Sequence, residues 1–300
     1  MTTAVLERPP ATTATSQEVM RRARRRRRLR RVGLNGLAVF VFLIFAFPVY
    51  WMLTTSFRRG VDIQSPNPTF LPFPGTLENF RKVFERPYFW DALRTSLIVT
   101  LSVVVIAVFV AFLTAVALAR FHFFGRKALI IAVIVVQMVP QEALIISLFK
   151  VLDGWQLTNT IIGLSLTYIM FVLPFTIWVL RGFVGNIPRE LEEAAIVDGA
   201  TRLRAFFTIT FPLVAPGLVA TGVFAFIQAW NDFLFALVIM NKPENQTLPV
   251  WVQAFNEGAK GTDWGGVMAG STIMAIPVII FFLLVQRWVA GGLTAGAVKG

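Results

Sequence analysis

The chain has 300 residues, of which 56% are hydrophobic and only 15% are charged, and its mean hydropathy is +0.69. Soluble domains usually carry about 25% charged residues, so this composition is typical of a membrane protein. The length accommodates roughly six spans of about 20 residues with short connections. It excludes a large soluble catalytic domain in addition to those spans.

The residue types that carry much of enzyme chemistry are scarce. The chain has no cysteine and a single histidine, His122, which excludes disulfides, thiolate catalysis and cysteine or histidine metal clusters. None of the six lysines is followed by serine or threonine, so the chain lacks a lysine that would complete a glycine-rich phosphate-binding loop. With no visible nucleophile, base and orienting group, we expect a protein that is not an enzyme.

Six long apolar runs with almost no charge follow one another along the sequence. Their lengths of 20 to 27 residues fit spanning helices, whereas a transmembrane strand needs only about 10 alternating residues. The sequence therefore predicts an all-α, polytopic membrane protein with six transmembrane helices. The runs are residues 32–53, 95–118, 128–148, 161–180, 214–240 and 266–285.

The basic residues are distributed unequally between the two sides of these spans. If the amino terminus is cytoplasmic, 19 of the 28 Lys and Arg residues fall on the inner side and 9 fall outside or at the outer boundary. This asymmetry is the one expected from the positive-inside rule. We therefore expect a multi-pass protein of the plasma or inner membrane with both termini in the cytoplasm.

Much of the net charge of +12 lies in one arginine-rich run, residues 21–31. The run directly precedes the first span, where anionic lipid headgroups would lie, so we interpret it as a topology signal in contact with membrane lipid and expect no nucleic acid partner. We expect residues 1–31 to be a basic, disordered cytoplasmic tail and residues 32–300 to be the transmembrane domain.

Three connections are too long for tight turns, and function is expected to concentrate in them. Residues 58–93 contain a proline-rich stretch and then an amphipathic segment, residues 77–84, with apolar residues at helical spacing. Residues 181–213 form an inner loop. Residues 241–265 form an outer loop with aromatic side chains that we expect to be exposed: Trp251, Phe255 and Trp264, beside Asn256.

The inner loop contains its own helix start and stop signals. Pro188 suits the first helical position, three glutamates follow in the first turn, and Gly199 suits the left-handed conformation that ends a helix. Thr201 is placed to cap a second helix. The small side chains of Ala194 and Ala195 allow close approach of another protein, although an interfacial helix lying against lipid headgroups explains them equally well.

This loop resembles that of the permease subunits of binding-protein-dependent ABC importers, which has the pattern Glu-Ala-Ala, three residues, Gly, and a later Ile and Pro. The matching residues are Glu193, Ala194, Ala195, Gly199, Ile209 and Pro212, with Asp198, Ala200, Phe206 and Pro216 also in agreement. The resemblance implies the ABC importer permease fold and a coupling loop at residues 181–213. The residues implied to couple to the ATPase are Glu193, Ala194, Ala195 and Gly199 for docking, Asp198 and Arg202 as polar partners, Ala200, and Pro212 at the start of the next span.

Other stretches are similar to the carbohydrate-uptake branch of this family, in particular the second permease of maltose-type systems. They are residues 72 and 76–80, 230–233, 248–250 and 292–300. The resemblance implies a second homologous permease subunit, two ATP-binding subunits that use ATP and Mg²⁺, and an extracytoplasmic solute-binding protein. It implies no cofactor on this chain, and a contact of residues 292–300 with the ATPase subunits.

Polar residues within or near the spans are candidates for solute contact, because intramembrane polar groups are often functional. Amides beside aromatic rings suit a neutral, hydroxyl-rich solute, although interhelical hydrogen bonding is the alternative for each residue. Pro48, Pro140, Pro174 and Pro277 are expected to kink their helices. The candidates for the pathway are Gln137, Gln141, Gln228, Trp230, Asn231 and Asp232.

Two other classes of transporter remain as alternatives. An ion-coupled secondary transporter usually has repeated halves and a relay of intramembrane ionisable groups, whereas no repeat is apparent here and only Glu142 lies well inside a span. Within the importer class, a permease for peptides or amino acids is the second alternative.

Overall fold

The computed structural model describes residues 16–67, 70–256, 258 and 261–296. Our expectations for residues 1–15, for Lys260 and for the last four residues of the segment 292–300 concern positions outside the described residues. The described residues form helices joined by loops, with one isolated antiparallel bridge between Asn256 and Thr262. The predicted all-α fold class is confirmed.

Helix α1 (Ser16–Ser56) contains the first predicted span and the whole arginine-rich run. The expectation of disorder for residues up to 31 therefore differs from the structure, which is helical from Ser16 onward. Arg, Ala, Met and Leu are strong helix formers, so the apolar helix continues through them without a break. The chain divides into two compact units, Met1–Leu53 and Thr54–Gly300. Helices α2 to α13 belong to the second unit.

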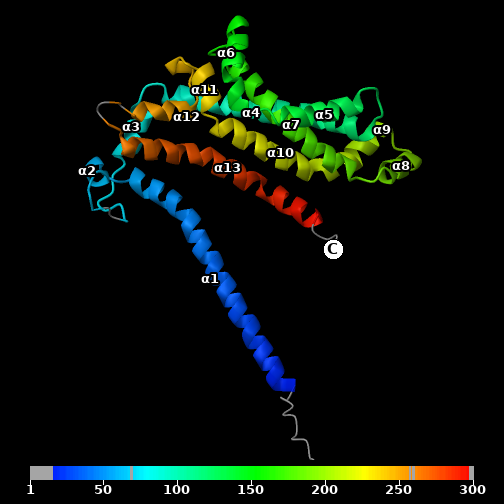
Figure 1. The fold of residues 1–300 in the computed structure, drawn as a ribbon, viewed down its shortest axis with the longest axis horizontal. Helices are drawn as coiled ribbons and strands as arrows, with labels where there is room; N and C mark the ends of the chain where they lie inside the picture. The colour runs from blue at the N-terminus through cyan, green and yellow to red at the C-terminus, as the bar shows by residue number, and fades with distance from the viewer. Residues whose placement is uncertain (1–15, 68–69, 257, 259–260, 297–300) are drawn as a thin grey trace, which may run out of the picture. The chain divides into compact units, whose positions relative to one another are not determined.

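Four long helices make up the centre of this unit: α4 (Phe89–Arg120), α7 (Ile161–Gly185), α10 (Phe211–Asn231) and α13 (Trp264–Gly296). They lie side by side in Figure 1, and α4 packs most extensively against α7. Ala107, Ala111 and Ala115 of α4 are fully buried; small side chains at such spacing let helices approach closely in a membrane. The predicted second, fourth and sixth spans are confirmed.

The third predicted span is not one helix. It consists of α5 (Arg126–Val136) and then η1 (Gln141–Leu144) with α6 (Ile145–Gly154), and the two parts meet at an angle of 94°. Pro140 lies at the break; it has no N–H to donate, and its ring disfavours helical geometry at the preceding residue. The described residues therefore hold five long apolar helices, or six spans if this bent pair counts as one.

The fifth predicted span, residues 214–240, is wrong at both ends. A continuous helix runs through Arg202–Asn231 and comprises α9 (Arg202–Ala205), a π-turn η2 (Phe206–Thr210) and α10. Asp232 is extended and separates α10 from the short α11 (Leu234–Ile239). The apolar run continues into α11, so hydropathy alone did not indicate where the long helix ends.

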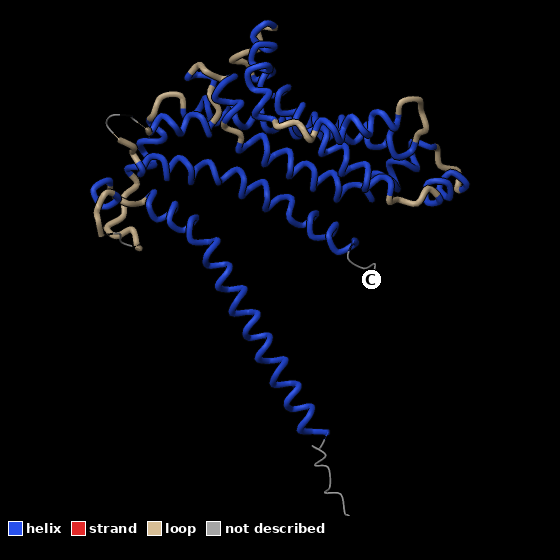
Figure 2. Tube along the Cα trace, viewed as in Figure 1, coloured by secondary structure: helices blue, strands red, loops and turns tan. Residues whose placement is uncertain are grey.

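Several of the shorter helices lie at the two ends of the four-helix centre; Figure 2 shows the helices in blue and the loops in tan. One end carries α8 (Glu190–Val197) and α9. The opposite end carries α2 (Gly60–Ile63), α3 (Glu78–Glu85), η3 (Pro243–Asn245), α12 (Leu248–Trp251) and η4 (Val252–Phe255). The predicted amphipathic helix at residues 77–84 is α3, shifted by one residue.

Candidate functional site

The loop between α7 and α10 forms the predicted helix-turn-helix. Helix α8 ends in a Schellman motif in which the amide of Gly199 donates to the carbonyl of Ile196 (3.0 Å) and that of Ala200 donates to Ala195 (2.9 Å). Gly199 has φ +90°, in the left-handed region, and an added Cβ there would meet no atom within 4 Å. Glycine is therefore required by the backbone conformation and not by crowding.

Two details of this loop differ from the sequence interpretation. Helix α8 begins at Glu190, so Pro188 precedes the helix and does not occupy its first position. Thr201 caps α9 as predicted, accepting from the amide of Arg204 at 3.3 Å. However, Pro212 does not start the next span, because the helix already runs from Arg202. The amide of Phe211 donates to the carbonyl of Phe206, and this wider π-turn immediately precedes Pro212, which has no N–H to donate.

An ion pair and several hydrogen bonds attach α8 to the central helices. Arg120 at the end of α4 lies 3.0 Å from the carboxylate of Glu192 and also donates to the carbonyl of Ile187 at 3.1 Å. The hydroxyl of Thr210 donates to the same Glu192 carboxylate. Arg189 donates to the carbonyl of Arg120 at 3.1 Å. Glu192 is thus directed inward, whereas the sequence suggested only a role at the positive end of the helix.

The other side of the loop is open. Glu193, Ala194, Asp198 and Arg202 are exposed, and Ala195 and Ala200 are half-buried. Three large apolar side chains accompany them, with Val197 86% exposed, Leu203 71% and Phe207 60%. Small, charged and apolar groups together form a surface that suits contact with another protein.

A second group of predicted residues converges between α7 and α10. Gln141, Gln228 and Asp232 line a small cavity of about 40 Å³ together with Tyr168. The hydroxyl of Tyr168 donates to Asp232 at 2.7 Å, and the amide of Ala236 donates to the same carboxylate at 3.1 Å. Tyr168 was not predicted from the sequence, because a tyrosine in an apolar helix is indistinguishable there from a packing residue.

A larger cavity of about 160 Å³ lies against the bent third span. It is lined by Gln137 and Gln141 at the break, and by residues of α7 and α10 that include Pro174 and Phe224. Gln141 lines both cavities. The break at Pro140 therefore brings two amide side chains to the same face of α7. Hydrogen-bonding amides beside aromatic rings can hold a polar, uncharged molecule.

Two of the pathway candidates lie elsewhere. Trp230 is 1% exposed and donates through Nε1 to the carbonyl of Met274 at 3.1 Å, so it packs α10 against α13 and presents no ring surface to either cavity. Asn231 is exposed and donates to the carbonyl of Ile227 at 2.9 Å. The expectation of exposed aromatics in residues 241–265 also needs correction, because Trp251 and Phe255 are buried. Of the four residues that we expected to be exposed in this loop, Trp264 and Asn256 are exposed.

No group of three or more His, Cys, Asp or Glu side chains suited to a metal ion occurs among the residues that the structure describes. The candidate site consists of two cavities between helices, each with amide side chains in its lining, and one protruding, helix-containing loop. They resemble the parts of a transport pathway and a docking element.

Comparisons with known proteins agree with this geometry. The chain is 44% identical over 270 residues to the diacetylchitobiose uptake system permease protein DasC of Streptomyces coelicolor, covering 90% of this chain and 98% of that one. It is 38% identical over 282 residues to the trehalose/maltose transport system permease protein MalG of Thermococcus litoralis, covering 91% and 98%.

A bacterial ABC transporter involved in import of the acidic polysaccharide alginate has the same fold, with a TM-score of 0.73, 21% identity, and coverage of 87% of this chain and 96% of that one. Residues 103–294 match a model of a transport family, and this range includes the protruding loop and all the lining residues of both cavities. The chain belongs to the family of binding-protein-dependent transport system inner membrane components.

Proposed function

We propose that this chain is a permease subunit of an ATP-driven, binding-protein-dependent importer of sugars, and that it forms half of the translocation pathway. The main support for the proposal is the structure of the loop that contains α8. It is attached to the central helices by Arg120 and Glu192 and exposes a surface of small, charged and apolar residues. Such a surface suits docking on a separate ATPase subunit, which would change the permease between two conformations.

The partners follow from the same proposal. A second homologous permease would complete the pathway, two ATP-binding subunits would use ATP and Mg²⁺, and an extracytoplasmic solute-binding protein would deliver the solute. The α8 loop and both termini would then be cytoplasmic, in agreement with the unequal distribution of Lys and Arg. Residues 181–213 would be the coupling loop.

Sugar is the proposed solute class for two reasons. The relatives described above are named for the uptake of diacetylchitobiose and of trehalose or maltose. In addition, Gln137, Gln141 and Gln228 supply amides, and Phe171 and Phe224 supply rings, at the two cavities. Amides bond hydroxyl groups in either direction, and rings contact the apolar faces of sugars. We infer an oligosaccharide, because both relatives are named for sugars of more than one ring and because the two cavities follow one another along α7.

The test is uptake into proteoliposomes that contain the assembled complex, with radiolabelled oligosaccharide loaded on the associated binding protein. We expect uptake to require ATP on the side of the membrane that carries α8. We also expect uptake to persist when ionophores collapse all ion gradients. Uptake that stops with the gradients would identify an ion-coupled carrier instead. Delivery of peptides or amino acids, and not of sugars, by the binding protein would overturn the solute class alone.

A further inference from the structure

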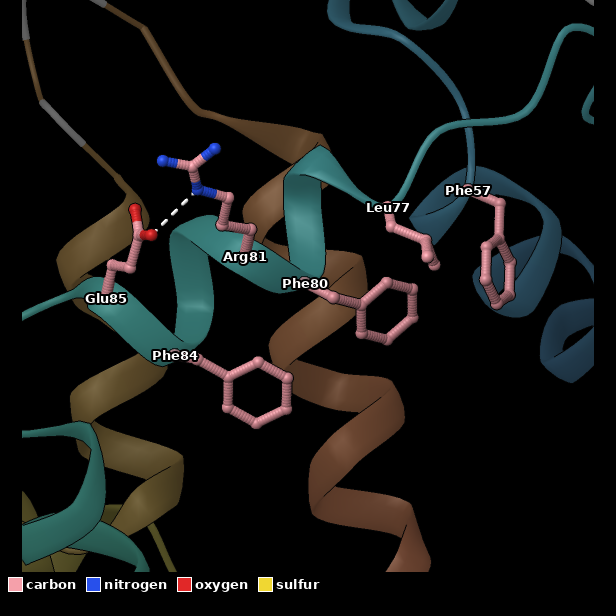
Figure 3. Close-up of a pocket in the computed structure, with 6 residues that line it drawn as sticks. All are labelled: Phe57, Leu77, Phe80, Arg81, Phe84 and Glu85. Atoms are coloured by element: carbon pink, nitrogen blue, oxygen red, sulfur yellow. Dashed lines mark hydrogen bonds and ion pairs between the residues drawn. The ribbon is translucent and has the colours of Figure 1, made fainter.

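An apolar groove lies along α3, at the end of the helical centre opposite α8. Its volume is about 500 Å³, and it is lined by Phe57, Leu77, Phe80, Arg81, Phe84 and Glu85. Figure 3 shows the three rings and Leu77 on one side of the helix, and the Arg81–Glu85 ion pair along the other. That ion pair is 2.7 Å long and exposed. The groove is thus apolar, with the Arg81–Glu85 ion pair along one edge.

The opposite face of α3 is fixed to the protein. Asn79 is buried and donates to the carbonyls of Ser56 (2.9 Å) and Arg58 (2.7 Å). Val83 is fully buried, and Lys82 lies 3.6 Å from Asp263. These contacts set the rotation of α3 about its axis. The side with Leu77 and Phe84 consequently points away from the packed helices.

The exposed apolar area here is larger than the groove itself. Leu77 is 68% exposed and Phe84 44%. Residues close to it along the chain are also exposed: Phe70, Leu71, Phe73, Tyr88 and Trp90. Exposed apolar side chains of this number indicate contact with a membrane or with another protein.

The chain positions of these residues indicate the bilayer surface. Phe57 follows directly after the membrane helix Arg30–Ser56, and Phe89 begins the membrane helix Phe89–Arg120. Phe84 stacks on Trp90 at the beginning of that second helix, with ring centroids 5.9 Å apart. The residues that line the groove therefore belong to the segment that joins two spans along the chain. Tyr and Trp are enriched at this level of a bilayer.

We propose that this groove binds the acyl chain of a bilayer phospholipid, with the lipid phosphate at Arg81. Phe84 of the groove stacks on the exposed Trp90 at the start of α4, and the lining is apolar apart from Arg81 and Glu85. The Nε of Arg81 donates to Glu85, which leaves its terminal N–H groups to bind a phosphate at the depth of the headgroups. Helix α3 is then an interfacial helix. It anchors the segment between the first two membrane helices while the rest of the subunit changes conformation.

The absence of cysteine from the chain allows a direct test by spin labelling. Single variants Leu77→Cys and Phe84→Cys carry a nitroxide in the assembled complex, in phospholipid nanodiscs and with partner cysteines removed. Glu78→Cys is the matched control, because Glu78 lies on the same helix, is exposed and does not line the groove. Power saturation then compares collisions with oxygen, which enters lipid, and with a water-soluble nickel chelate.

The proposal predicts an oxygen-to-nickel collision ratio several-fold higher at positions 77 and 84 than at position 78. A ratio equal to that of the control would mean that the groove faces water. Protection from both reagents would mean that another protein, such as a partner subunit or the solute-binding protein, covers it. Either result overturns the proposal.

A second measurement needs no substitution. A phospholipid with a photoactivatable carbene precursor in its acyl chain is incorporated with the unmodified complex, and labelled peptides are identified by mass spectrometry. We expect labelling within residues 77–90 as well as in the lipid-exposed spans. Labelling of the spans without labelling of residues 77–90 would overturn the proposal.

Discussion

Arg120, the last residue of α4, lies 3.0 Å from Glu192 in α8, and its side chain is only 11% exposed. The pair connects one of the most buried helices of the protein with the loop that protrudes from it. Because α4 packs extensively against α7, we expect a displacement of α8 to reach the centre of the helical unit through this contact.

Replacing Glu192 by alanine should therefore weaken the coupling of ATP hydrolysis to solute uptake. The change leaves the largely buried Arg120 without its carboxylate partner and should lower the free energy of unfolding by about 1.5 to 3 kcal/mol, as for hydrogen bonds to charged groups. Uptake per ATP hydrolysed in proteoliposomes should fall. Glu190→Ala is the matched control, since Glu190 lies in the same helical turn but is exposed. Equal effects of both substitutions would show that the inward carboxylate has no special role.

Gly199 should tolerate neither alanine nor valine. At φ +90° an L-residue is disfavoured by roughly 1 to 2 kcal/mol, and a β-branched residue by more. The expected result for Gly199→Val is ATPase activity without uptake, and normal membrane insertion. Gly199→Asn should restore part of the uptake, because asparagine adopts the left-handed conformation more readily. Full uptake by the valine variant would contradict this expectation.

The Tyr168–Asp232 hydrogen bond should stabilise the junction of α10 and α11. Tyr168→Phe removes the donor and leaves the carboxylate, which should lower stability by about 1.5 to 3 kcal/mol and reduce uptake. Thermal unfolding of the purified complex measures the first effect. Asn231→Ala, which changes the exposed neighbouring residue, should leave the unfolding temperature unchanged. A Tyr168→Phe variant as stable as the native complex would argue against the contact.

Two glycines of α7 should respond in opposite ways to alanine. A Cβ at Gly163 would overlap the carbonyl oxygen of Leu157, whereas one at Gly182 would meet no atom within 4 Å. Gly163→Ala should therefore destabilise the protein by about 1 to 3 kcal/mol. Gly182→Ala should stabilise the helix by up to about 1 kcal/mol. Unfolding temperatures of the two variants, measured side by side, check the prediction, and equal shifts would refute it.

Hydropathy located the long helices because a bilayer imposes a minimum apolar length on each of them. It failed where the backbone changes direction within an apolar run. The 94° bend after α5 depends on Pro140, which we expected only to kink a continuous helix. Likewise, the boundary at Asp232 lies inside a run whose following residues, in α11, are as apolar as those before it.

At the candidate site, local rules predicted local features. The left-handed Gly199 and the cap by Thr201 depend on neighbouring residues alone, and both are present. The inward direction of Glu192 and the burial of Trp230 depend on α4 and α13, which are distant in sequence. No periodicity within one segment contains that information.

The unbroken helix from Arg202 to Asn231 has a mechanical consequence. Its 30 residues extend roughly 45 Å at 1.5 Å per residue. The proposed docking surface lies at its first residue, and the Tyr168–Asp232 contact lies just beyond its last. A tilt imposed at the docking end would thus reach the opposite membrane surface along one helix, without passing through a loop.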